Sequence, residues 1–250
     1  MGFTDPSFIL LDSVDSTNNY AMAKAHAGLA KHGDAWFAHS QTGGKGQRGK
    51  KWHTGNGENI ALSIVIVPAQ LAMDEQFKLS VAVALGCFDF FRSYAGEDTK
   101  IKWPNDIYWR DRKAGGVLIE NIIGRTATGG NWKFAVVGIG MNVNDTAFEN
   151  GLKNAVSLKQ ITGKHFNVVE LAKELQLQVL QHIAAINRIP FESILRKYND
   201  HLFKANEVVQ LKKGNIVFNT IIKSVTENGQ LATVDTIDNY FDFGEVEWVL

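Results

Sequence analysis

Residues 41–52 read QTGGKGQRGKKW, a stretch with four glycines and four cations that ends on an indole ring. Glycine lets the backbone reach positive φ and approach a ligand closely, while successive amide N–H groups and cationic side chains attract negative charge. Trp52 adds a flat surface on which a base can stack. The stretch therefore predicts an anion-binding loop, placed between two strands at 34–39 and 59–67.

A second polar cluster lies further along the chain. Residues 102–106 read KWPND, and after a short polar turn residues 112–116 read RKAGG. Carboxylate and amide oxygens such as those of Asp106 and Asn105 are ligands for hard cations, Mg²⁺ among them. Together the two clusters indicate a site for a nucleotide phosphate and a metal ion. A P-loop NTPase is excluded, because the GxxxxGK[ST] pattern does not occur.

Composition restricts the class of protein. The chain has 250 residues, enough for one large domain with a small appendage, and its 26 Lys and Arg balance 26 Asp and Glu. General attraction to nucleic acid or to anionic membranes is therefore not expected. The single cysteine, Cys87, lies in an apolar run and is interpreted as a buried structural thiol. The first residues lack an export signal, and no apolar stretch has membrane-spanning length, so we expect a soluble, cytoplasmic protein.

Helices and strands are predicted throughout the N-terminal part of the chain. The first helix begins at Asp15 or Ser16, whose side chains can cap it, and a polar hairpin turn is expected at 110–113. A β-branched run supports the strand at 59–67. The remaining predicted elements are strands at 8–11, 34–39, 100–103, 107–109, 114–123 and 132–142, and helices at 16–31, 74–94, 168–189 and 191–201.

After Lys204 the pattern changes to short β runs separated by turns. They are predicted at 208–211, 216–225, 230–236 and 240–248 and indicate a small β-barrel. No low-complexity linker precedes them. We expect two closely packed domains, 1–203 and 204–250.

Five motifs together resemble the biotin-protein ligase family, the biotin-[acetyl-CoA-carboxylase] ligases. They are DSTN at 15–18, GKGQRG at 44–49, KWPND at 102–106, KAGG at 113–116 and GIGMNVN at 138–144. The resemblance implies an α+β fold, in which a mixed sheet flanked by helices is related to class II aminoacyl-tRNA synthetases and biotin/lipoate ligases, with an SH3-like C-terminal domain. The catalytic pattern begins near residue 8, so we expect a monofunctional ligase without the DNA-binding domain of some members.

The resemblance also implies the chemistry. Biotin's carboxylate attacks the α-phosphate of ATP to give biotinyl-5′-AMP, and a lysine of a biotin carboxyl carrier protein then attacks the anhydride. The implied catalytic residues are Lys113 and Arg48, and Asp106 is the implied Mg²⁺ ligand. The implied biotin-binding residues are Ser16, Thr17, Asn18, Gln41, Gly44, Lys45, Gly46, Gln47, Lys113, Gly115 and Gly116, and the implied nucleotide-binding residues are Arg48, Gly49, Trp52, Lys102, Asn105, Asn142 and Asn144.

Two residues depart from the family pattern. Lys45 and Gln47 stand where the family commonly has arginine, which removes the bidentate fork at both positions and the charge at one. The activity is expected to survive, with altered affinity. The glycines of this segment predict a loop that orders when biotin binds. Taken alone, the stretch 110–113 predicts a lysine in solvent, so the role of Lys113 depends on the resemblance.

Two other functions remain open from the sequence. Lipoate-protein ligases share the fold, the acyl-adenylate and a carrier lysine, although KWPND favours biotin. From another class, 45–51 with Trp52 has the basic and aromatic composition of a nucleic-acid-binding arm. The net charge and the order of the motifs count against this second function. The partner expected is the carrier protein, without DNA or membrane, and the enzyme is expected to be a monomer or a homodimer.

Overall fold

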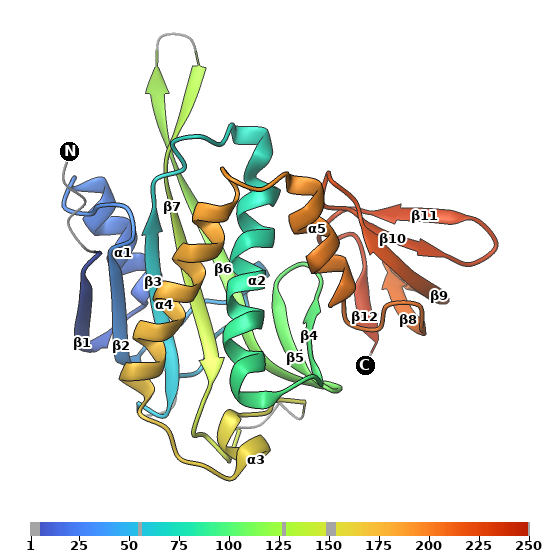
Figure 1. Ribbon diagram of the computed structural model, residues 1–250, viewed down its shortest axis with the longest axis horizontal. Coiled ribbons are helices and arrows are strands. Elements are labelled where there is room, and N and C mark those ends of the chain that lie inside the picture. Colours follow the sequence, from blue (N-terminus) through green and yellow to red (C-terminus); the bar gives the residue numbers. More distant parts are fainter. Residues whose placement is uncertain (1–5, 55–56, 127–128, 149–153, 250) are drawn as a thin grey trace.

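The computed structural model describes residues 6–54, 57–126, 129–148 and 154–249. The first residues of the chain, on which the expectation about export depends, and Gly55 of the glycine-rich segment lie outside these ranges. The chain forms two sheets with helices packed on both faces of the first (Figure 1). None of the described helices is long and apolar enough to cross a membrane.

The first sheet has seven strands in the order β1-β2-β3-β7-β6-β5-β4. β1 and β2 are parallel, whereas the other neighbours are antiparallel, so the predicted mixed sheet is confirmed. β3 lies next to the central strand β7, and every residue of β3 is buried because both faces are covered. The strands are β1 (Phe8–Val14), β2 (Ala35–Gln41), β3 (Asn59–Ile66), β4 (Thr99–Lys102), β5 (Asp106–Trp109), β6 (Arg112–Thr126) and β7 (Gly129–Asn142).

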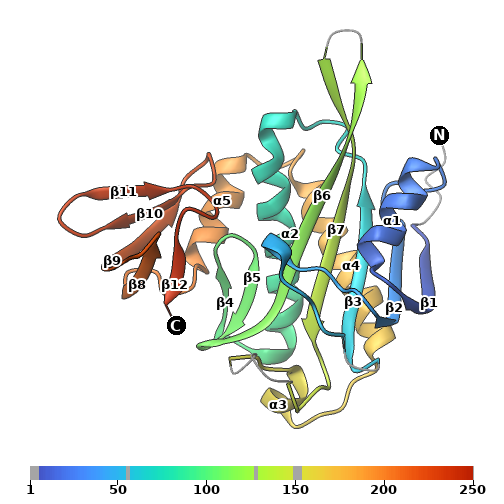
Figure 2. The same cartoon turned by 180° about the vertical axis from the view of Figure 1, so that it is seen from behind.

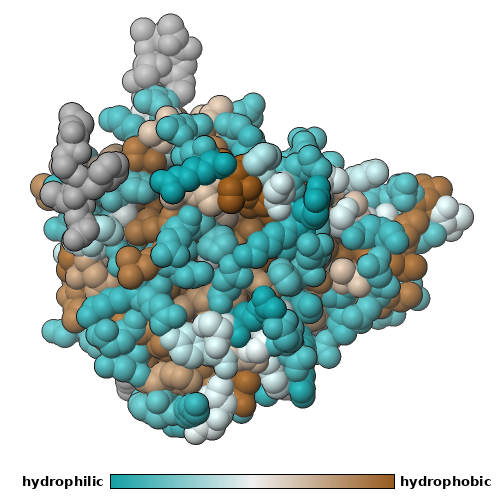
Figure 3. All heavy atoms as spheres, viewed as in Figure 1, coloured by the Kyte–Doolittle hydropathy of each residue, from teal (hydrophilic) through white to brown (hydrophobic). Residues whose placement is uncertain are grey.

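Helices cover the first sheet on both sides. α2 (Gln76–Ala95) and α4 (Val168–Ala185) pack on one face and enclose the main core, whereas α1 (Thr17–His26) packs on the other face over a smaller core (Figures 1 and 2). The outer surface of the α2 and α4 layer is mostly hydrophilic, with hydrophobic side chains scattered over it (Figure 3). α2 and α4 approach closely at Gly86, where an added Cβ would lie 2.8 Å from the Cα of Val179.

The second sheet is antiparallel throughout, in the order β11-β10-β9-β8-β12. α5 (Phe191–Asp200) joins it to the first sheet, and Asn199 of this helix exchanges two hydrogen bonds with the backbone of Val225. A second antiparallel sheet is consistent with the expected small barrel-like domain. Its strands are β8 (Val208–Lys213), β9 (Ile216–Val225), β10 (Leu231–Val234), β11 (Asp238–Phe241) and β12 (Glu247–Val249).

Three local predictions were wrong. The helix predicted at 16–31 ends at His26, because Gly28 adopts a left-handed conformation (φ 71°) and closes it. The run predicted at 240–248 is two strands, since the chain turns between them at Gly244 (φ 88°). The polar turn predicted at 110–113 is confined to the two residues between β5 and β6, and Lys113 belongs to β6.

The described residues also include three short helical elements and the single cysteine. The short helix α3 (Leu158–Thr162) was not predicted, although Ser157 and Gln160 form a capping box and Gly163 ends it. The single-turn elements are η1 (Gln47–Gly49) and η2 (Met73–Glu75). Cys87 is fully buried, as predicted, and burial raises the pKa of its thiol.

Candidate active site

A cleft of about 1240 Å³ opens on the α1 side of the first sheet. The glycine-rich loop after β2 crosses in front of β7 and β6 on this side (Figure 2), and the second sheet contributes a further wall. Most of the predicted site residues line the cleft: Ser16, Thr17, Asn18, Gln41, Lys45, Gly46, Gln47, Arg48, Trp52, Lys102, Asp106, Lys113, Gly116 and Asn142. Five others do not line it directly: Gly44, Gly49, Asn105, Gly115 and Asn144.

One wall of the cleft is neutral and polar. The side chain of Gln41 accepts a hydrogen bond from the backbone N–H of Thr17 at 2.8 Å, so β2 satisfies the first-turn amide of α1. Ser16 is the N-cap residue, yet its side chain makes no capping bond, which corrects the expectation that it caps the helix. The hydroxyl of Ser63 in β3 donates to the side-chain oxygen of Asn18 at 2.6 Å and lies 2.8 Å from the hydroxyl of Thr17. These groups suit an uncharged ligand that both donates and accepts hydrogen bonds.

The glycine-rich loop is folded back on itself. Lys45 and Lys51 form an antiparallel bridge, and the N–H of Gly46 donates to the carbonyl of Lys50 at 2.7 Å. Gly44 accepts a hydrogen bond from the N–H of Trp52, and an added Cβ on Gly44 would lie 2.3 Å from the carbonyl oxygen of Trp52. Gly44 therefore closes the base of the loop by its small size, away from the cleft itself.

Gln47 and Arg48 connect the loop to distant parts of the chain. The Nε2 of Gln47 donates to the side-chain oxygen of Asn105 and to the carbonyl of Val117, both at 3.0 Å. The Nη2 of Arg48 donates to the carbonyl of Gly244 at 3.1 Å. The family commonly has a charged arginine at this position. Gln47 instead holds the loop through the hydrogen bonds of its neutral amide. Arg48 lines the cleft but also fastens the loop to the second sheet.

Lys113 and Asp106 form an ion pair at the cleft. The Nζ of Lys113 lies 2.7 Å from the Oδ2 of Asp106, and the two side chains are about one-third exposed. Gly116 faces Asp106 across the β5–β6 ladder, and an added Cβ there would lie 2.8 Å from the Asp106 carboxylate and 3.1 Å from the Lys113 Nζ. Because Lys113 belongs to β6, its side chain reaches the cleft. The local sequence alone predicts a solvent-exposed hairpin turn at this residue.

Lys102 is a largely buried cation in the same cleft. Burial lowers the pKa of its ammonium from 10.5 to about 8. The group lies 3.2 Å from the hydroxyl of Tyr108 and over the ring of Trp248, whose centroid is 5.2 Å away. Burial also raises the pKa of the Tyr108 phenol, so this neighbour stays neutral. A desolvated cation gains more from an anionic ligand than a solvated one does.

The KWPND segment is supported from the side of the second sheet. The indole N–H of Trp103 donates to the carbonyl of Gly229 at 3.0 Å, and its ring contacts Phe243 edge to face. The hydroxyl of Tyr198 in α5 donates to the carbonyl of Pro104 at 2.7 Å. Asn105 is buried, and its side-chain amide donates to the carbonyl of Val117. The hairpin carrying Lys102 and Asp106 is thus fixed by residues remote in sequence.

The indole ring of Trp52 packs against Gly140 of β7. An added Cβ on Gly140 would lie 2.2 Å from the indole ring, so this glycine makes room for it. The indole N–H of Trp52 is buried and has no protein acceptor among the described residues. Asn142 donates to the carbonyl of Val156, whereas Asn144 exchanges hydrogen bonds with the backbone of Phe166 at both ends of its amide. Asn144 therefore shapes the loop after β7.

Sequence reasoning missed several residues of the cleft region. Ser63 and Glu120 are polar residues inside apolar strands, which was the available signal for both. Residues of β12 and of the turn before it also line the cleft, namely Phe243, Gly244, Val246, Glu247 and Trp248, but no local signal could have found them, because only the fold brings them there. Within the ranges described, no three His, Cys, Asp or Glu side chains form a metal cluster.

The cleft combines a neutral hydrogen-bonding wall with an excess of positive charge. Among the described residues, six cations line it against three carboxylates; the cations are Lys45, Arg48, Lys50, Lys51, Lys102 and Lys113, and the carboxylates are Asp106, Asp145 and Glu247. This arrangement suits an enzyme that brings an anionic substrate to a nucleotide. The profile of the Biotin/lipoate A/B protein ligase family matches residues 10–142. The chain therefore belongs to this family.

Relatives and solved structures support the assignment. The bifunctional ligase/repressor BirA of Escherichia coli is 33% identical over 148 residues, which are 59% of this chain and 44% of that protein. A biotin--[acetyl-CoA-carboxylase] ligase of Paracoccus denitrificans is 28% identical over 229 residues, covering 89% and 92% of the two chains. The biotin protein ligase of Aquifex aeolicus, solved with biotin and ATP, has the same fold, with a TM-score of 0.79, 22% identity and 98% of each chain covered.

Proposed function

We propose that the protein is an ATP-dependent ligase that activates biotin as biotinyl-5′-AMP and transfers the biotinyl group to a lysine of a biotin carboxyl carrier protein. The observation that carries the proposal is the meeting, in one cleft, of a neutral wall around Thr17 and Gln41 with the cations Lys102 and Lys113. The chain spans about half the length of the BirA relatives that it matches, between 40% and 55% of each, so the ligase activity of this chain is a proposal. The names of the relatives favour biotin over lipoate.

The chemistry begins with two anions that repel each other. A carboxylate oxygen of biotin attacks the α-phosphorus of ATP, the bond to the β-phosphate oxygen breaks, and pyrophosphate leaves. Lys113 would lie between the two anions and favour their approach, and Lys102 would neutralise the departing pyrophosphate. The neutral wall would bind the ureido ring, which needs donors and acceptors instead of charges.

The second step transfers the acyl group. A neutral lysine amine of the carrier attacks the acyl carbon of the mixed anhydride, the amine loses a proton, and AMP leaves. Lys113, placed at the same junction, would polarise the acyl carbonyl. Trp52 and the loop residues Lys45, Gly46 and Gln47 would cover the reacting groups and exclude water. No nucleophile of the enzyme is required.

Mg²⁺ fits the cleft as an ion shared with the substrate. Asp106 supplies one carboxylate, and Mg²⁺ is commonly held by one or two carboxylates together with phosphate oxygens and water. When bound, the ion would neutralise phosphate charge. Asp106 would hold it, and Lys113 would keep that carboxylate oriented through their ion pair.

We also propose a domain boundary, a cellular compartment and an oligomeric state for this protein. The boundary between 1–203 and 204–250 is supported by two isolated bridges, since Leu202 still pairs with Ile101 of the first sheet and Ala205 pairs with Ile222 of the second. We place the reaction in the cytoplasm, where ATP and carrier proteins are available. We propose that the enzyme is a monomer or a homodimer. Analytical sedimentation at the concentration used in the activity assay distinguishes the two.

Adenylate formation tests the proposed function. With α-labelled ATP and Mg²⁺, the protein is expected to form labelled acyl-AMP from biotin, and much less from lipoate or octanoate offered in parallel. Thin-layer separation of the nucleotides measures the product. Activity with lipoate alone would move the protein to the lipoate ligases. No adenylate from any of the acids would contradict the ligase function, and salt-sensitive retention of single-stranded nucleic acid would then support a binding arm.

The low pKa of Lys102 predicts an alkaline limit to nucleotide use. Below about pH 8 the group is charged and attracts phosphate, and as the pH rises through that value the charge is lost. The kcat/KM for ATP, which reports groups of the free enzyme, is therefore expected to fall above about pH 8. Lys102→Arg keeps the charge and should remove this alkaline limb. A limb that persists unchanged in the arginine variant would assign it to another group.

A further inference from the structure

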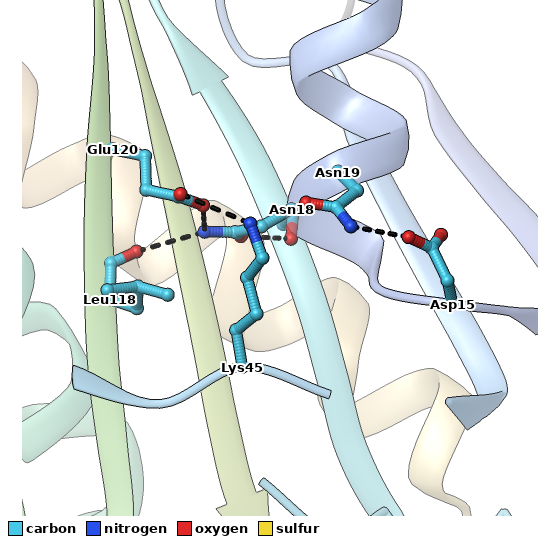
Figure 4. Close-up of polar contacts among 7 residues, drawn as sticks. Asp15, Asn18, Asn19, Lys45, Leu118 and Glu120 are labelled. Atoms are coloured by element: carbon cyan, nitrogen blue, oxygen red, sulfur yellow. Dashed lines mark hydrogen bonds and ion pairs between the residues drawn. The ribbon is translucent and has the colours of Figure 1, made fainter. Parts of the chain in front are cut away.

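Glu120 is a carboxylate of β6 whose two oxygens hold two different parts of the cleft (Figure 4). Its Oε2 accepts a hydrogen bond from the side-chain amide of Asn18 at 2.8 Å, and its Oε1 lies 3.4 Å from the ammonium of Lys45. Asn18 belongs to α1 and is buried, whereas Lys45 belongs to the glycine-rich loop. One side chain thus joins the fixed wall of the cleft to the loop that covers it.

The orientation of the Asn18 amide is fixed by its surroundings. Ser63, Gly138 and Leu118 face one another across β3, β7 and β6. The Asn18 side chain crosses this row, accepting from Ser63 at 2.6 Å and donating to the Leu118 carbonyl at 3.4 Å as well as to Glu120. An added Cβ on Gly138 would lie 2.2 Å from the Asn18 oxygen, so glycine leaves the space for this crossing.

A directed chain of hydrogen bonds follows from this orientation. A carboxylate only accepts, so Asn18 must turn its nitrogen to Glu120 and its oxygen to Ser63. Ser63 then gives its single hydroxyl hydrogen to Asn18, while its oxygen lies 2.8 Å from the hydroxyl of Thr17. The oxygen of Gln41 is fixed separately by the backbone N–H of Thr17, which leaves the amide nitrogen of Gln41 directed to Thr54 at the cleft.

We propose that Glu120 is a positioning residue that sets the direction of this hydrogen-bond chain and holds Lys45 over the biotin end of the cleft. The inference rests on the proposed function only for the identity of the ligand. Glu120 itself does not line the cleft, so it acts through Asn18 and Lys45.

The isosteric variant Glu120→Gln tests both roles. A glutamine amide can present either end to Asn18, so the direction of the chain is no longer imposed, and the ion pair with Lys45 is lost. The affinity for biotin, measured by titration calorimetry, is expected to fall about tenfold. The KM for ATP and the urea midpoint of unfolding are expected to change little. This split separates positioning from a general structural role.

Loop cleavage gives a second readout that needs no ligand. Trypsin cuts after lysine and arginine, and the loop offers Lys45, Arg48, Lys50 and Lys51. Loss of a partly exposed ion pair should increase the cleavage rate about threefold in Glu120→Gln. In a double-mutant cycle, the effects of Glu120→Gln and Lys45→Met on biotin affinity should be less than additive, because both remove the ion pair, and the loss that Glu120→Gln still causes in the Lys45→Met protein reports the contact with Asn18.

Asp89→Asn is the matched control. Asp89 is also a partly buried carboxylate with two partners, His182 and Lys197, but it lies among α2, α4 and α5 away from the cleft. This variant should change stability without changing biotin affinity or loop cleavage.

The outcomes separate the two proposals. If the wild-type protein binds no biotin, the proposed function fails, and faster loop cleavage in Glu120→Gln still supports the hold of Glu120 on Lys45. Unchanged loop cleavage together with unchanged biotin affinity in Glu120→Gln would overturn the inference. An equal effect in Asp89→Asn would overturn it as well, because the cause would then be general destabilisation.

Discussion

Replacing Lys113 with alanine is expected to lower the rate of adenylate formation by about 10²–10³-fold, the usual loss when one charge-stabilising group is removed from a reacting centre. Lys113 lies in β6 with its ammonium 2.7 Å from Asp106, in a cleft whose other cations are placed on separate elements. Its removal takes away the ammonium that would attract both anions and the ion pair that orients the Asp106 carboxylate. The variant therefore loses charge stabilisation and the orientation of a neighbouring group at the same point.

The measurement is single-turnover formation of labelled biotinyl-AMP at saturating ATP. Lys197→Ala is the matched control, since Lys197 also pairs with an aspartate, Asp89, but lies outside the cleft. It should leave the rate within about twofold, because this ion pair lies away from the reacting groups and His182 still pairs with Asp89. Lys113→Arg should recover only part of the activity, because the guanidinium is planar and larger. A Lys113→Ala enzyme that keeps its rate within about threefold would remove this residue from the mechanism.

The Gly86→Val variant is expected to lower the free energy of unfolding by about 3 kcal/mol, at the upper end of the range for overpacked cores. An added Cβ at Gly86 would lie 2.8 Å from the Cα of Val179, so α2 and α4 must separate to admit any side chain. Valine offers no gain in helix propensity large enough to offset this cost. Gly86→Ala should cost less, because it adds less bulk and favours the helix.

Urea denaturation followed by circular dichroism measures the difference. Ser93→Val, also in α2 but exposed, reports the cost of a β-branched residue in this helix without the crossing. We expect that cost to stay below about 1 kcal/mol. If the two valine variants lost equal stability, the close approach of α2 and α4 would not be the cause.

Much of the first sheet followed from local sequence. Strands such as β3 and helices such as α2 have long apolar patterns, and their type was predicted correctly even where their ends moved by a few residues. Lys113 shows where this reasoning ends. The polar residues before it indicate a turn, but pairing with β5 extends the strand through Arg112, and only that pairing directs Lys113 to the cleft.

The contacts between distant segments could not be predicted. Glu120 and Ser63 were visible as polar residues in apolar strands, yet their partners depend on the register of three strands and on the passage of Asn18 over Gly138. In the sequence, Gln47 indicates only that the positive charge of the family's arginine is absent. In the fold, its side-chain amide donates a hydrogen bond to Asn105. Local patterns determine which elements form, and the pairing between elements determines what each polar side chain contacts.

The support that the second sheet gives to the cleft has a consequence for building chimeric ligases. Trp103 and Arg48 both donate to backbone carbonyls, those of Gly229 and Gly244, so these two hydrogen bonds depend on the path of the chain and not on the side chains of the second sheet. Both glycines have positive φ, and an added Cβ on Gly229 would lie 2.8 Å from the ring of Phe77. A grafted C-terminal segment should therefore be accepted if it keeps these two turns and the rings of Phe243 and Trp248 that face Trp103 and Lys102, whereas a segment that shifts the two turns would release the loop and the hairpin together.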